Sequence, residues 1–192
     1  MGIPREAHAI DTNSSAIRAM RDSLALTDYQ QQLLIGLLLG DGALVPNSWM
    51  KHYRLFIGHG EEQKAYLFWL YKAFQSFTLS APKYHTLTKS WRFRTISHPA
   101  FTAFHDSFYP QGSKAVPESI RDLLVSPLSL AIWYMDDGCY VKRNRTFVLN
   151  TQSFSKIDNE RLQMCLLENF GITANLNRDK RYWRLYIPMR SA

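Results

Sequence analysis

Two apolar runs, each ending in Asp-Gly, limit what this chain can fold into more than any other feature. They read LLIGLLLGDG from Leu33 to Gly42 and LSLAIWYMDDG from Leu128 to Gly138. A helix that is apolar on nearly all faces must be buried on nearly all faces. Two such helices in a chain of 192 residues, 46% of them apolar, are therefore expected to pack on each other at the centre of the fold.

Both runs are preceded by signals for the start of a helix. Thr27, followed three residues later by Gln30, fits a capping box, and it predicts a helix from about Asp28 to Gly40. Ser126 is a good N-cap, and Pro127 suits the first position of the second helix.

The spacing of small residues predicts how the two helices meet. Gly36 and Gly40 lie four residues apart on one face of the first helix, where they would permit a close approach. Glycine lowers helix stability by about 1 kcal/mol relative to alanine in a helix interior. Two glycines in one helix therefore indicate that close packing requires them. In the second helix we expect Ala131 to supply the small residue, beside the bulky Ile132 and Trp133.

The pattern that follows each run occurs twice. After each run come stretches typical of strands, with an amphipathic helical stretch between them. The strand stretches are Met50–His59, Lys83–Ser97, Cys139–Phe154 and Ile172–Pro188, and the helical stretches are Glu61–Phe77 and Ser155–Phe170. Asp41 and Asp137 occupy equivalent places in the two copies, which indicates an internal duplication. We expect an N-terminal appendage at 1–26 with a short helix near 16–23, a first half at 27–110, a linker at 111–126 and a second half at 127–192.

Positive charge is concentrated in the strand regions. The chain has a formal charge of +7 and a pI near 9.5. Segments 43–60, 83–98, 139–156 and 172–190 hold 15 of the 23 lysines and arginines but only one of the 16 acidic residues, so they carry +14 and the remainder −7. This distribution predicts a polyanionic partner that meets the strands.

The two nine-residue motifs LIGLLLGDG (34–42) and LAIWYMDDG (130–138), with KAVPESIRDLL before the second and VLNTQSF after it, resemble the LAGLIDADG homing endonucleases of the monomeric double-motif type. The resemblance covers roughly residues 27–190. It implies an α+β fold of two pseudo-symmetric αββαββα halves, with the motif helices packed at the centre and two sheets forming a saddle over double-stranded DNA. It also implies a sequence-specific nuclease that hydrolyses phosphodiesters at a long asymmetric site.

The same resemblance implies the site residues. The final acid of each motif, Asp41 and Asp137, is expected to bind Mg²⁺ (or Mn²⁺), assisted by the carbonyls of the preceding Gly40 and Asp136. Hard cations of this kind prefer carboxylates, waters and phosphate oxygens. Lys114 corresponds to the lysine of a Lys-x-(Ile/Val)-Pro segment that lies near the scissile phosphates, so it is a candidate catalytic residue. A second such lysine and a final helix are expected to be missing after the last strand.

The alternation of basic and apolar residues in the strands predicts one core face and one face free to read the major groove. The candidate DNA-binding residues are Lys51, Arg54, Lys89, Arg92, Arg94, Lys142, Arg143, Arg145, Arg178, Lys180, Arg181 and Arg184. On the last strand, Tyr182, Arg184 and Tyr186 are expected on the open face.

Two other functions fit parts of the sequence. The segment Tyr134–Asp137 also matches the catalytic aspartate pair of reverse transcriptases, but 192 residues are too few for a polymerase palm and fingers. An RNA-splicing maturase, with intron RNA as partner, or a cleavage-inactive DNA-binding protein on the same fold stays open as the alternative.

The remaining composition predicts a protein inside the cell, in a bacterial cytoplasm or an organelle, and the resemblance to the double-motif type implies a monomer. No run of 18 apolar residues occurs, and the N-terminus is charged, so neither a membrane partner nor a secretory signal is expected. Cys139 and Cys165 are expected as reduced core thiols, and the six histidines show no zinc spacing.

Overall fold

The computed structural model describes residues 14–189. The predicted appendage at 1–26 therefore lies partly outside the described residues, and the part inside contains α1 (Ser15–Ser23), which confirms the short helix expected there. Ser14 caps this helix, because its hydroxyl accepts a hydrogen bond from the Ile17 N–H.

The chain forms two compact units. Of the described residues, the first unit contains 14–30 and 42–104, and the second contains 31–41 and 105–189. Two helices run from the first unit into the second: α2 (Asp28–Leu39) and α4 (Pro99–Phe108). The capping box predicted for α2 is present. The Thr27 N–H donates to Gln30 Oε1 at 3.0 Å, and the Gln30 N–H donates to Thr27 Oγ1 at 3.2 Å.

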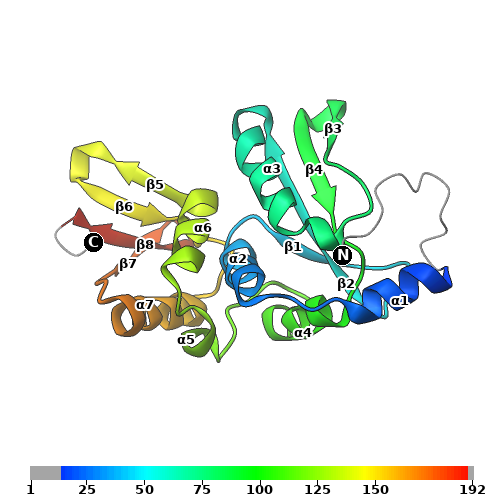
Figure 1. Ribbon diagram of the computed structural model, residues 1–192. Helices are drawn as coiled ribbons and strands as arrows, with labels where there is room; N and C mark the ends of the chain where they lie inside the picture. The colour runs from blue at the N-terminus through cyan, green and yellow to red at the C-terminus, as the bar shows by residue number, and fades with distance from the viewer. Residues whose placement is uncertain (1–13, 190–192) are drawn as a thin grey trace. The chain divides into compact units, whose positions relative to one another are not determined.

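The first unit is built on a four-stranded antiparallel sheet. Its strands are β1 (Ala43–Pro46), β2 (Tyr53–Gly60), β3 (Lys83–His85) and β4 (Ser90–Arg94), in the order β1-β2-β4-β3. The helix α3 (Lys64–Ala73), flanked by the 3₁₀ turns η1 (Glu61–Gln63) and η2 (Gln75–Phe77), packs on β2 and β4 (Figure 1). Leu67, Leu70 and Phe93 are buried between helix and sheet.

The second unit repeats this arrangement. Its strands are β5 (Gly138–Val141), β6 (Thr146–Leu149), β7 (Asn175–Asp179) and β8 (Tyr182–Pro188), in the order β5-β6-β8-β7. The helix α7 (Lys156–Phe170) covers one face of this sheet, and the short α5 (Ile120–Leu123) packs on α7 (Figure 1). The equivalent strand orders of the two antiparallel sheets confirm the predicted α+β fold and agree with a duplication.

Three of the four predicted strand regions are hairpins, and in the fourth, Met50–His59, β2 forms a hairpin with the preceding β1. The reason is a non-glycine residue with positive φ in each connecting turn, since such a residue reverses the chain. These residues are Met50, Lys89, Arg145 and Lys180, with φ of 54°, 47°, 47° and 56°. In two turns the positive-φ residue follows a 3₁₀ turn, η3 (Thr86–Thr88) or η4 (Lys142–Asn144). The strand β1 precedes the predicted Met50–His59 stretch, and neither α4 nor α5 was expected from residue patterns alone.

The two motif helices differ in burial. Every residue from Leu33 on α2 to Gly40 in the following turn is buried, as predicted. In α6 (Pro127–Asp137) Ala131 and Met135 are exposed, so the expectation that this helix is buried on nearly all faces is wrong. The side of α6 that carries Ile132 and Trp133 is the side that the fold covers fully.

The cysteines also differ from the prediction in part. Cys165 is buried on α7, as expected, but Cys139 is exposed because it lies on β5, a strand at the edge of its sheet. Over residues 14–189, no helix is long and apolar enough to cross a membrane.

Candidate metal and catalytic site at the motif helix ends

The second unit holds the end of α2 directly against α6. A Cβ built on Gly36 would lie 2.5 Å from the Ser129 carbonyl oxygen and 2.7 Å from Ile132 Cβ. Real Cβ atoms do not approach other atoms so closely, so only glycine fits at position 36. The close approach of the helices predicted from the glycine spacing is therefore confirmed, and the packing gain offsets the cost of glycine in a helix.

The residues that meet the glycine face are not those expected. Ala131 is exposed, and Ser129 and Ile132 face Gly36 instead. The Ser129 hydroxyl donates to the Gln32 carbonyl at 2.8 Å and lies 2.6 Å from Gln32 Oε1, which ties the two helices together about two turns before the terminal acids. The expected role of Ala131 is wrong because the rotation of α6 about its axis, which residue spacing leaves open, turns that side chain to solvent.

The turn that carries Asp41 follows α2. The helix ends at Leu39, Gly40 is buried in the turn, and Asp41 is exposed beyond it. The Asp41 N–H donates to Asp136 Oδ2 at 3.1 Å. A carboxylate of α6 thus holds the backbone of the first motif's terminal acid.

The terminal acid of the second motif has a different environment. Asp137 is the last residue of α6 and is half-buried. Its carbonyl accepts two hydrogen bonds from Asn150, one from the backbone N–H and one from Nδ2, both at 2.9 Å. Burial, together with the negative charge of Asp41, raises the pKa of the Asp137 carboxyl to about 6, although Lys114 acts in the opposite direction.

Lys114 joins this group from 74 residues away along the chain. Its Nζ donates to the Gly40 carbonyl at 2.6 Å. Burial lowers the pKa of the Lys114 ammonium to about 8, while Asp137, Asp41 and Asp136 oppose that shift. The structure therefore brings together the three residues predicted as catalytic, Asp41, Asp137 and Lys114, within one charged cluster.

The donor set suits a hard divalent cation. Three carboxylates and the Gly40 carbonyl offer only oxygen atoms, which Mg²⁺, Mn²⁺ and Ca²⁺ accept. One oxygen of Asp41 and one of Asp136 lie within 4.8 Å of each other. Like charges this close are stabilised by a counter-ion, so the residues present fit the metal that the motifs imply.

The candidate DNA-binding residues of the first unit fall into two groups. Arg92 and Arg94 pair in register with Gly58 and Phe56 of β2, so they share the face that also carries Arg54. Lys51 and Lys89 lie in the hairpin turns.

Arg54 and Arg94 lie close enough on this face for their charges to act on each other. Burial, followed by the charge of Arg94, lowers the pKa of the Arg54 guanidinium. Arg54 Nε is buried and finds no hydrogen-bond partner among the described residues. Two neighbouring guanidinium groups of this kind suit an anionic partner.

In the second unit, most candidates lie in hairpin turns. These are Lys142, Arg143 and Arg145 between β5 and β6, and Lys180 and Arg181 between β7 and β8. On β8, Tyr182, Arg184 and Tyr186 alternate with Trp183, Leu185 and Ile187, and Leu185 and Ile187 are buried, as expected. Arg184 is paired with Asp179 at 2.8 Å. Arg178 lies opposite Trp183 in register and therefore faces away from Arg184.

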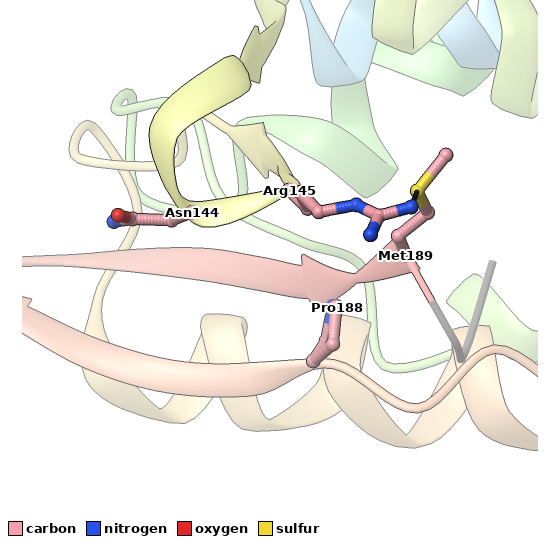
Figure 2. A pocket seen from close by; sticks show the side chains of 4 residues that line it. All are labelled: Asn144, Arg145, Pro188 and Met189. Carbon is pink, nitrogen blue, oxygen red and sulfur yellow. Dashed lines mark hydrogen bonds between the residues drawn. The ribbon is translucent and has the colours of Figure 1, made fainter.

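Arg145 borders a shallow, open hollow where the β5–β6 turn meets the end of β8. Figure 2 shows its lining residues, Asn144, Arg145, Pro188 and Met189. The Met189 N–H donates to the Arg145 carbonyl at 3.1 Å, which ties the turn to the end of the strand. The hollow therefore belongs to the β5–β6 turn, which carries the candidate DNA-binding residue Arg145.

Sequence reasoning missed two contacts at the site. Asn150 lies within the VLNTQSF segment, but no role was assigned to it, and its contact with Asp137 depends on the return of β6 to the end of α6. Asp136 was assigned a role only through its carbonyl, whereas its side chain also contacts the first motif. The sequence did offer one signal for this contact, because the second motif has an acid, Asp136, at the position where the first motif has Gly40.

Comparisons with known proteins point to one family. The family model described as the LAGLIDADG DNA endonuclease family matches residues 31–192. A relative named DNA endonuclease I-ChuI, from Chlamydomonas applanata, is 29% identical over 88% of this chain and 88% of its own length. Another, named probable intron-encoded endonuclease 1, from Wickerhamomyces canadensis, is 30% identical over 85% of this chain and 75% of its own length. A weaker match, the cytochrome b mRNA maturase bI2 of Debaryomyces hansenii, is 27% identical over 77% of this chain and 59% of its own length.

Comparison with solved structures also finds similarity to homing endonucleases. The homing endonuclease I-WcaI bound to its DNA recognition sequence superposes with a TM-score of 0.84 and 26% identity, over 97% of this chain and 87% of that one. I-DmoI in complex with DNA and Mn superposes with a TM-score of 0.54 and 18% identity, over 83% of this chain and 89% of that one, which supports the fold alone.

Proposed function

The chain belongs to the LAGLIDADG DNA endonuclease family, and from this premise we propose that it is a sequence-specific homing endonuclease of the monomeric, double-motif type. It hydrolyses one phosphodiester in each strand of a long, asymmetric DNA site. The asymmetry of the site follows from the unequal halves of a single chain, since each half would meet a different DNA sequence.

The observation that carries the proposal is the cluster of Asp41, Asp137 and Lys114 where the motif helices end. Asp41 and Asp137 would hold the metal, with the carbonyls of Gly40 and Asp136 as further oxygen donors. A bound divalent cation supplies polarisation of the phosphate, an attacking water of lowered pKa and stabilisation of the leaving oxygen. Mg²⁺ or Mn²⁺ is the proposed ion, since both accept an all-oxygen site.

Lys114 places a positive charge in direct contact with the motif ends. With its ammonium at the Gly40 carbonyl and three carboxylates acting on its charge, it is placed to stabilise negative charge on a reacting phosphate or to orient a water. Its partial burial strengthens such an interaction, because the effective dielectric is lower than in bulk water.

The strand faces and hairpin turns bind the DNA in this proposal. Arg54, Arg92 and Arg94 form an open basic face on the first sheet, and Arg184 lies on the open face of the second. Basic side chains on a two-stranded ribbon can contact phosphates and read guanine edges in the major groove. The turn residues extend this surface with Lys51, Lys89, Lys142, Arg143, Arg145, Lys180 and Arg181, and Arg178 would contact DNA only from the edge of β7.

We assign the two halves of the duplication to residues 27–110 and 127–192, joined by 111–126, with the N-terminal residues to 26 as an appendage. The matching strand orders of the two sheets support two halves with the same fold. The protein would act as one chain on one duplex, which sedimentation of the complex with target DNA would measure.

The experiment that tests the function is selection of cleaved sites from a randomised duplex library in Mg²⁺. Enrichment of one asymmetric sequence, with loss of cleavage in Asp41→Asn, is the expected result. Failure to cut any duplex in Mg²⁺ or Mn²⁺ would overturn the proposal. The alternative, a maturase or a cleavage-inactive binding protein, has less support because DNA endonuclease I-ChuI and the probable intron-encoded endonuclease 1 match this chain better than the maturase does, and it predicts binding without cleavage.

A further inference from the structure

The two motifs differ at the position before the terminal acid. The first motif has Gly40 there, and the second has Asp136. The family resemblance gives this position a role in metal binding only through its backbone carbonyl, which any residue could supply. A side chain as costly to place as a carboxylate, half-buried beside two other acids, therefore needs a separate explanation.

The contacts of Asp136 supply one. Its Oδ2 accepts a hydrogen bond from the Asp41 N–H at 3.1 Å. Within α2 the chain satisfies its amides in the ordinary way up to Gly40, whose N–H bonds to the Gly36 carbonyl at 3.0 Å. The Asp41 N–H follows Gly40, just past the end of the helix, and its acceptor is the Asp136 carboxylate on α6.

Gly40 and Asp136 are also complementary in shape. A Cβ on Gly40 would lie 2.5 Å from Asp136 Cβ and 2.7 Å from Asp136 Oδ2. The Asp136 side chain therefore fills the space that a side chain at position 40 would need. The glycine in one motif and the acid in the other form a matched pair across the helix contact.

From this pair we propose that the Asp136 side chain is a positioning residue for Asp41, acting by accepting the Asp41 N–H and so setting the turn that aims the Asp41 carboxylate. The inference rests on the proposed function, since it assigns Asp41 a metal. The Asp137 carboxylate does not depend on this contact, because its backbone is held through its carbonyl by Asn150.

The positioning role requires a hydrogen-bond acceptor at position 136 and does not require a negative charge. Asp136→Asn keeps an acceptor oxygen of the same reach, and Asp136→Ala removes it. The measurements are single-turnover cleavage of target DNA, the Mg²⁺ concentration for half-maximal rate, calorimetric binding of Ca²⁺ to the DNA-free protein, and DNA affinity in Ca²⁺.

We expect Asp136→Ala to weaken Ca²⁺ binding and raise the half-maximal Mg²⁺ concentration by about 10-fold or more, the usual effect of removing a residue that orients a metal ligand. Asp136→Asn should stay within about threefold of wild type on both measures, and DNA affinity should be unchanged in both variants. If Asn is as damaging as Ala, the charge itself is required and positioning is refuted. If Ala matches wild type, the contact has no role.

A second pair of variants tests the match in shape without any need for activity. Gly40→Ala should lower the melting temperature strongly in the wild-type background and much less in Asp136→Gly, because that variant lacks both the Cβ and the carboxylate that the new Cβ would meet. Equal effects in both backgrounds would contradict the proposal. Wild type that neither binds Ca²⁺ nor cleaves DNA would instead contradict the proposed function, so the two failures are distinguishable.

Discussion

The two motif ends start from nearly the same sequence and reach different environments. Asp41 lies beyond the end of α2, is exposed, and is held through its amide by Asp136. Asp137 is still part of α6, is half-buried, and is held through its carbonyl by Asn150. A repeated motif therefore specifies where a carboxylate stands, while the surroundings decide its solvation and its anchor.

The two motif ends also differ in how they interact with the Lys114 ammonium. Lys114 bonds to the carbonyl of Gly40 in the first motif, and its ammonium also acts on the pKa of Asp137 in the second. Lys114 thus interacts electrostatically with both Asp41 and Asp137, whose surroundings differ. The two strands of a DNA target are expected to be cut at different rates as a result.

The largest expected effect is the loss of either terminal acid. Asp41→Asn and Asp137→Asn should each reduce double-strand cleavage by roughly 10³-fold or more, because removing a metal ligand costs several kcal/mol of transition-state stabilisation. DNA binding in Ca²⁺ should stay largely intact. Plasmid cleavage and a gel-shift titration measure the two quantities, with the exposed Asp106→Asn as the control. Unchanged Mg²⁺-dependent cleavage by either variant would remove the active-site assignment.

Lys114→Met should have the next largest effect. We expect single-turnover cleavage to slow by about 10²-fold, equivalent to about 2.7 kcal/mol, at unchanged DNA affinity. Nicked circles should accumulate before linear product in a supercoiled-plasmid time course, because Lys114 bonds directly to the first motif end and acts on Asp137 of the second through its charge. Lys72→Met, an exposed lysine on α3, is the matched control. Equal rates for wild type and Lys114→Met would show that the lysine is only structural.

The open faces of the two sheets should differ in salt dependence. Replacing Arg92 and Arg94 together by Gln should flatten the salt slope of DNA binding by about one for each phosphate that is no longer neutralised. Arg184→Gln should flatten it less, since Asp179 already offsets that charge. The helix residues Lys64 and Lys72 should matter least. Salt titrations at fixed temperature compare these variants, and equal slopes for the strand and helix pairs would refute the assignment of the DNA-binding face.

The smallest expected effect concerns the stability of the metal-free protein. Folding raises the pKa of Asp137 to about 6, so this carboxyl costs no stability below its unfolded pKa, costs increasingly more as the pH rises from that value, and has its full destabilising effect above about pH 6. Asp137→Asn should therefore raise the free energy of unfolding by about 1 kcal/mol at pH 8, after allowing for partial exposure, and by nothing near pH 4. Urea melts at both pH values, without metal, measure the difference. A gain of the same size at pH 4 would point to packing instead of charge.

The sequence by itself determined the elements that depend on local signals. The capping box at Thr27, the Ser126-Pro127 start and the apolar periodicity are properties of neighbouring residues, and α2, α6 and α7 match their predicted bounds closely. The family resemblance assigned the metal residues, and the structure places Asp41 and Asp137 with Lys114 in one cluster. The hairpins were only partly foreseen, because the turn residues with positive φ, such as Lys89 and Arg145, carry no glycine signal.

Tertiary structure alone decided how the two motif helices meet. The rotation of α6 turns Ala131 to solvent and Ile132 toward Gly36, and no periodicity within a helix that is apolar on most sides could select that rotation. The carboxylate of Asp136 at the Asp41 amide and the ammonium of Lys114 at the Gly40 carbonyl join residues 95 and 74 positions apart. Such contacts depend on the crossing of elements in space, and local sequence preferences hold no information about that crossing.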